Sequence, residues 1–234
     1  MDVERRDGHD PPMIGNGQPD AMKRVHTSLL AAAERRLLIW ICPKLPTWVT
    51  PDQLTGLGLA AAMLTAAAYA LSELNPLWLW VAVLGYFLNW FGDSLDGTLA
   101  RFRNIERPAF GYFIDHSCDG LATLFIMTGL GLSPYVRLDV ALLAAAGYLL
   151  LAVHTFLAAK VTNIFKVSQG GMGPTEVRLI LIALTLAMFF LGPDGVRVGA
   201  IGGFDLFMGS TAIGCIMMFV VQTVKVGNTL LHKS

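Results

Sequence analysis

Charged residues are scarce in this chain of 234 residues. Asp, Glu, Lys and Arg make up 15% of the positions, hydrophobic residues make up 54%, and the mean hydropathy is +0.57. Soluble domains carry about 25% charged residues, so the composition excludes an ordinary soluble fold and indicates an integral membrane protein. The formal net charge is zero, which leaves no bulk electrostatic argument for nucleic-acid binding.

Cysteine is also rare, with three residues at Cys42, Cys118 and Cys215. The three are scattered, so they show no metal-binding spacing, and their odd number gives no disulfide framework. We interpret them as small buried side chains, which excludes a thiolate metal site.

The N-terminal residues 1–21 lack any apolar run that could bury surface, so we expect a disordered tail there. The tail also lacks the apolar core of a signal peptide, so the first span is expected to serve as the insertion signal. In residues 22–42, apolar and basic side chains alternate at helical spacing, which predicts a basic amphipathic helix in the membrane interface. The alternative, a first transmembrane span, is disfavoured by Glu34, Arg35 and Arg36 in its middle.

Six apolar stretches are long enough to cross about 30 Å of hydrocarbon. They run over residues 53–72, 76–98, 109–132, 137–159, 175–192 and 204–226. The predicted fold is therefore all-α, a polytopic membrane domain over residues 22–230 with six transmembrane helices after the interfacial helix.

Basic residues are distributed unevenly between the two sides of this layout. Of the 17 Lys and Arg residues, fifteen lie in the N-terminal region, in the second and fourth connections and at the C-terminal end. Only Arg137 and Arg197 lie on the other side. Because positively charged loops stay in the cytoplasm, we predict that both termini and the region 93–119 face the cytoplasm.

Four aspartates lie at helical spacing within this apolar sequence: Asp93 and Asp96, then Asp115 and Asp119. Each pair lies on one helix face, and Pro108 between the pairs predicts that the two helices fold back on each other. Carboxylates at membrane depth are costly and usually functional, and four converging ones require a compensating cation. Oxygen ligands favour magnesium or manganese, so the sequence predicts a metal site.

Small residues share the acidic faces, namely Gly97 and Ala100 on the first helix and Gly111 on the second. Their lack of bulk permits a large, flat ligand to approach the backbone. Arg101 is placed to pair with a phosphate. Together these residues indicate a pocket for a nucleotide that bears a pyrophosphate. The alternative is interhelical packing by small residues, for which four acids on two matched faces are a poor solution.

These residues form one pattern, Asp93-x2-Asp96-Gly97-x2-Ala100-Arg101-x9-Gly111-x3-Asp115-x3-Asp119. The pattern resembles the signature of the CDP-alcohol phosphotransferase family at all of its defining positions. The resemblance covers about residues 22–230. It implies a metal-dependent enzyme of phospholipid biosynthesis that transfers a phosphatidyl or phospho-alcohol group from a CDP-alcohol to an acceptor hydroxyl and releases CMP. It also implies two Mg²⁺ or Mn²⁺ ions and a homodimer.

The same resemblance implies roles for single residues. The metal ligands would be Asp93, Asp96, Asp115 and Asp119, and Asp119 would also act as the base that takes the proton of the acceptor hydroxyl. The cytidine and phosphate groups would lie against Gly97, Ala100, Arg101 and Gly111.

A second segment, Asp52-Gln53-Leu54-Thr55, resembles the nucleotide-binding stretch that precedes the first span in this family. Without the resemblance, Thr50 and Pro51 simply begin a helix, with Thr50 as its N-cap. Both interpretations stay open.

His116 lies between two of the acids, and the run from Asp115 to Asp119 resembles that of choline and ethanolamine phosphotransferases. A histidine here is a candidate acid or base; the alternative is a hydrogen-bond donor that orients a metal-ligating carboxylate. Arg178 is interpreted as a topology determinant, with binding of the acceptor as the alternative.

Three functions fit these residues. The first is an enzyme that uses CDP-diacylglycerol and a small alcohol, which the six-span architecture favours. The second is an enzyme that uses CDP-choline or CDP-ethanolamine with diacylglycerol, which His116 favours. The third is a cation-coupled transporter, which would require acids near the bilayer midplane and broken helices.

Overall fold

The computed structural model describes residues 23–25, 30–162, 164–166, 173–195, 197–199 and 201–232. Within this part, the chain is predominantly α-helical, with two short two-stranded sheets. The elements are β1 (Lys23–Val25), α1 (Ala31–Ile41), the 3-10 helix η1 (Cys42–Lys44), α2 (Pro51–Leu71), α3 (Trp78–Phe102), α4 (Pro108–Gly131), α5 (Leu138–Thr162), β2 (Ile164–Lys166), α6 (Pro174–Leu191), β3 (Arg197–Val198), β4 (Ile201–Gly202) and α7 (Gly203–Leu231).

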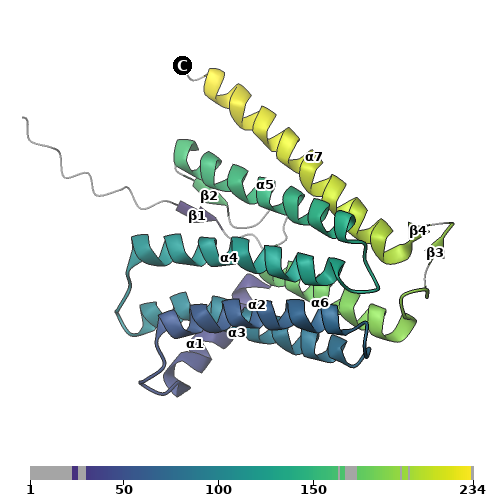
Figure 1. Cartoon of the computed structure of the whole chain (residues 1–234). Helices are drawn as coiled ribbons and strands as arrows, with labels where there is room; N and C mark the ends of the chain where they lie inside the picture. Colours follow the sequence, from purple (N-terminus) through teal and green to yellow (C-terminus); the bar gives the residue numbers. More distant parts are fainter. Residues whose placement is uncertain are drawn as a thin grey trace, which may run out of the picture.

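The long helices form a bundle in which α2 and α3 lie side by side, with α4, α5 and α7 following in order on one side (Figure 1). Both α3 and α4 pack against α2, α6 packs against α3, and α5 packs against α4. The last helix, α7, packs along α5 at the opposite side of the bundle from α1 (Figure 1). This arrangement confirms the all-α prediction for the long helices.

The six long helices coincide with the six predicted spans, and the largest shift is at the end of α7, which continues to Leu231 rather than to residue 226. Four of them, α2, α5, α6 and α7, are long and apolar enough to cross a membrane. The other two, α3 and α4, have similar lengths but carry the four aspartates. That α3 and α4 also cross the membrane stays a prediction.

The predicted helix over residues 22–42 is wrong in its first part. Lys23–Val25 forms a strand that pairs in parallel with Ile164–Lys166, and the helix begins only at Ala31. The reason is a non-local one, because the backbone groups of β1 find partners about 140 residues away, which helical spacing cannot reveal. The interfacial position of α1 stays a prediction, and the tail 1–21 lies outside the described residues.

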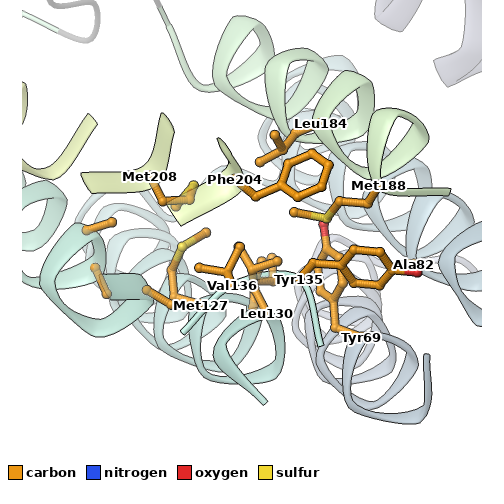
Figure 2. Packing of buried hydrophobic residues seen from close by; sticks show 14 of the residues in the cluster. Tyr69, Ala82, Met127, Leu130, Tyr135, Val136, Leu184, Met188, Phe204 and Met208 are labelled. Atoms are coloured by element: carbon orange, nitrogen blue, oxygen red, sulfur yellow. The ribbon is translucent and has the colours of Figure 1, made fainter. Parts of the chain in front are cut away.

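The main hydrophobic core is built from residues of all six long helices and of the turn after α4 (Figure 2). Met188 of α6 and Phe204 of α7 are buried there with Tyr135 from the turn. Tyr69 of α2 is fully buried, and its hydroxyl lies 2.5 Å from Thr185 Oγ1, which satisfies both polar groups. This core holds the ends of the helices that are distant from the aspartates.

The crossing of α2 and α3 is a close contact between backbones. A Cβ atom at Gly92 would lie 2.4 Å from the carbonyl oxygen of Leu54 and 2.6 Å from the nitrogen of Gly58. Small residues permit such close approach between membrane helices. The contact holds the segment that contains Asp93 against the first turns of α2.

The crossing predicts the effect of a single methyl group at Gly92. We expect Gly92→Ala to lower the free energy of unfolding by about 1–3 kcal/mol, because the Cβ would meet backbone atoms that cannot move aside. The check is the thermal unfolding midpoint of the purified protein in detergent.

The matched control is Gly56→Ala on the partner helix α2, where a Cβ would meet nothing within 4 Å. There alanine improves helix propensity by about 1 kcal/mol, so the midpoint should stay or rise. A Gly92→Ala protein as stable as the wild type would contradict the close crossing.

Candidate active site

The first acidic face belongs to α3 and contacts the start of α2. Asp96 is 9% exposed. Its Oδ2 atom accepts a hydrogen bond from Thr55 Oγ1 at 2.5 Å, and its Oδ1 atom accepts one from the backbone nitrogen of Gly97 at 2.5 Å. Thr55 belongs to the upstream segment singled out in the sequence, so the structure brings these two motifs together.

The second acidic face belongs to α4. The Nδ1 atom of His116 lies 3.8 Å from an oxygen of Asp115 and 3.6 Å from an oxygen of Asp119, too far for a hydrogen bond. The three side chains offer ligand atoms within 4.8 Å of one another, a grouping that can hold a metal ion. The rings of Tyr112 and Phe156 pack on His116, with centroids 4.5 Å and 4.9 Å away, and so restrict its orientation.

The two acidic faces meet, although both helices pack on α2. Asp93 interacts with Asp119 across the site, and Asp96 interacts electrostatically with both. The thiol of Cys118 lies close enough to interact electrostatically with all four acids. A set of carboxylate oxygens with one imidazole fits a hard divalent cation such as Mg²⁺ or Mn²⁺. The convergence predicted from helical spacing is therefore present.

Arg178 of α6 reaches the acidic face of α3. Its Nη2 atom lies 2.5 Å from Asp93 Oδ2, and its Nε atom donates to Asn89 Oδ1 at 2.9 Å. The amide nitrogen of Asn89 in turn donates to the carbonyl oxygen of Gly58 at 2.9 Å. Sequence reasoning missed Asn89, for which the available signal was its position one helical turn before Asp93.

The segment from Asp52 to Thr55 forms the start of helix α2. Thr50 caps α2 by accepting from the backbone nitrogen of Gln53, and the Gln53 side chain accepts from the backbone of Thr50. Leu54 is buried, and Asp52 forms an ion pair with Arg107. The helix start is thus confirmed, whereas nucleotide binding by these residues stays a prediction.

The small residues of the motif leave different amounts of space. A Cβ atom at Gly111 would meet nothing within 4 Å, and one at Gly97 would lie 3.4 Å from the guanidinium of Arg101. Arg101 is exposed and donates to Thr98 Oγ1 at 3.3 Å. Ala100 is partly buried beside it. Arg101 therefore lies over the surface of Gly97, where a phosphate group was predicted.

Glu34 of α1 was interpreted only as a charge on an interfacial helix, but it joins three helices. Its Oε1 atom accepts from Trp90 Nε1 and Ser94 Oγ of α3, both at 2.8 Å. Its Oε2 atom accepts from Thr175 Oγ1 of α6 at 2.9 Å. Since Ser94 follows Asp93 directly, this carboxylate anchors α1 beside the acidic site.

The fold and the acidic site define a helical integral membrane protein with a candidate divalent-metal centre. The sequence model of the CDP-alcohol phosphatidyltransferase family matches residues 48–224, and the chain belongs to this family.

Similarity to individual proteins agrees with the assignment to this family. Cholinephosphotransferase 1 from Gallus gallus is 32% identical over 125 residues, which are 47% of this chain and 37% of that protein. Archaetidylinositol phosphate synthase from Pyrococcus horikoshii is 35% identical over 99 residues, which are 42% of this chain and 50% of that protein. The chain thus matches half or less of the length of these relatives.

A solved structure has the same fold. The crystal structure of Mycobacterium tuberculosis phosphatidylinositol phosphate synthase with CDP-DAG bound superposes with a TM-score of 0.60. The match covers 82% of this chain and 94% of that chain at 19% identity.

The contacts of Glu34 predict how α1 is held. We expect Glu34→Ala to lower the free energy of unfolding by about 2–4 kcal/mol, because three donors lose a charged acceptor. Amide hydrogens of α1 should then exchange faster, as hydrogen-exchange mass spectrometry measures directly.

Glu106→Ala is the control, since Glu106 is exposed in the connection between α3 and α4. Its exchange pattern in α1 should match the wild type. If Glu34→Ala leaves the exchange of α1 unchanged, Glu34 does not anchor this helix.

Proposed function

We propose that this protein transfers a phosphatidyl or phospho-alcohol group from a CDP-alcohol to an acceptor hydroxyl and releases CMP. The observation that carries the proposal is the convergence of acids from two helices, Asp93 and Asp96 on α3 with Asp115 and Asp119 on α4. Membership of the CDP-alcohol phosphatidyltransferase family supports the reaction class.

Divalent cations, when bound, would neutralise the pyrophosphate and stabilise charge on the CMP leaving group. In this proposal Asp93, Asp96, Asp115 and Asp119 would hold two Mg²⁺ or Mn²⁺ ions. Thr55 and the backbone nitrogen of Gly97 fix the carboxylate of Asp96, so that its orientation is set before substrate arrives.

Proton transfer is assigned to the α4 face. Asp119 takes the proton from the acceptor hydroxyl as the oxygen attacks the β-phosphorus of the donor. Two aromatic rings hold His116 with its Nδ1 atom 3.6 Å from Asp119, so a small approach of the two side chains would let it orient this carboxylate and receive the proton afterwards. Arg101, exposed over Gly97, binds a phosphate of the donor.

The preferred donor is CDP-diacylglycerol, with a small alcohol as acceptor. The shared fold with a phosphatidylinositol phosphate synthase that binds CDP-DAG supports this choice. A second candidate, transfer from CDP-choline or CDP-ethanolamine to diacylglycerol, is favoured by the 32% identity to cholinephosphotransferase 1 and by His116. Family membership argues against the transporter alternative.

Sidedness and assembly belong to the proposal as well. The excess of basic residues on one side supports an active site and both termini in the cytoplasm. The family resemblance supports a homodimer.

An activity assay tests the reaction and the donor together. Purified protein in lipid nanodiscs is offered CDP-diacylglycerol, CDP-choline or CDP-ethanolamine with candidate acceptors, and released CMP is measured. We expect CMP release with CDP-diacylglycerol and its loss in EDTA. Release with CDP-choline alone would select the second candidate, and no CMP with any donor in Mg²⁺ or Mn²⁺ would refute the reaction.

The role of Asp119 predicts a specific loss. We expect Asp119→Asn to lower kcat at least about 10²-fold, because the amide can neither accept the proton nor carry the ligand charge. Asp194→Asn, on the connection after α6 where Asp194 pairs with Arg197, should keep wild-type turnover. Full turnover in Asp119→Asn would refute the assignment of the base.

A further inference from the structure

The side chain of Arg178 is committed to α3 rather than to solvent. Only 13% of it is exposed, and two of its nitrogens bond to residues one helical turn apart on α3, Asp93 and Asn89. A guanidinium stays protonated at any physiological pH. A permanent positive charge therefore lies against one of the proposed metal ligands.

The contact is built from three helices. Asn89 is buried, and the bond from its amide nitrogen to Gly58 of α2 turns its oxygen toward Arg178. At the same α2–α3 crossing, a Cβ atom added to Gly58 would lie 3.4 Å from the backbone nitrogen of Asp93. An exposed ion pair contributes little, but an enclosed pair with a fixed neighbour is held in one geometry.

The start of α6 is fixed independently. Thr175, one turn before Arg178, donates to Glu34 of α1, and the Glu176 side chain accepts from the backbone nitrogens of Gly173 and Leu30. These bonds hold the first turn of α6 beside α3. The contacts of this first turn therefore place Arg178 next to Asp93.

The acids are compensated in different ways. Asp96 accepts from the neutral donors Thr55 and Gly97, whereas Asp93 contacts a full cation through one oxygen. A divalent ion bound by Asp93 would lie within a few ångströms of this guanidinium and would be repelled by it.

We propose that Arg178 is a positioning residue that serves as the internal counter-ion of Asp93. It orients Asp93 and offsets its charge when no metal is bound, and its positive charge lowers the affinity of the site for divalent cations. The acidic site is thereby stable without metal, and the metal stays exchangeable. The inference rests on the proposed function, because it takes Asp93 as a metal ligand.

The test is a titration of the full-length protein in detergent with MgCl₂, starting in EDTA, with thermal unfolding as the readout. In Arg178→Gln we expect a lower unfolding temperature without metal and a magnesium midpoint about tenfold lower than in the wild type, because repulsion of the ion is removed. In Arg178→Lys the midpoint should lie between the two, since the charge remains but the two-pronged contact is lost.

Arg103→Gln is the matched control. Arg103 directly follows α3 and donates to backbone carbonyls of the connection before α2, including Pro46 at 2.9 Å. Losing these bonds should lower the unfolding temperature equally with and without magnesium, and the magnesium midpoint should not move.

A magnesium midpoint in Arg178→Gln equal to or above that of the wild type would overturn the proposal and leave the proposed function standing. If Arg178→Gln does not fold, an unchanged or higher midpoint in Arg178→Lys has the same meaning. If magnesium does not stabilise the wild type, the metal site itself fails and the inference falls with it.

Discussion

The constraint on which this structure depends is that four carboxylates in an apolar helical bundle need donors and cations around them. Asp96 receives two hydrogen bonds from Thr55 and Gly97, and Asp93 receives an ion pair from Arg178. These partners come from α2, α3 and α6. Satisfying the acids therefore ties together helices that are far apart in the sequence.

Close packing makes these bonds possible. The contact between Gly58 and Gly92 lets α2 and α3 approach until their backbones touch, which brings Thr55 to Asp96 and Asn89 to the backbone of α2. The hydrophobic core around Tyr69 and Phe204 fixes the far ends of the helices (Figure 2). Packing thus supports both ends of the bundle, and the chemistry lies at the end that carries the acids.

The sequence was sufficient for features that depend on local periodicity. The long helices and the grouping of Asp93 with Asp119 follow from apolar runs and from spacings of three and four residues. It was not sufficient for contacts between distant segments. The strand at Lys23–Val25, the three donors to Glu34 and the pairing of Arg178 depend on partners that helical spacing cannot identify.

The central claim is that acids of α3 and α4 together form a metal centre that receives a CDP-alcohol. The most direct measurement is anomalous diffraction from crystals grown with Mn²⁺ and CDP-diacylglycerol. We expect manganese peaks between α3 and α4, in contact with Asp93, Asp96, Asp115 and Asp119. Manganese bound elsewhere, or nucleotide bound in the crystal with no manganese among these four residues, would contradict it.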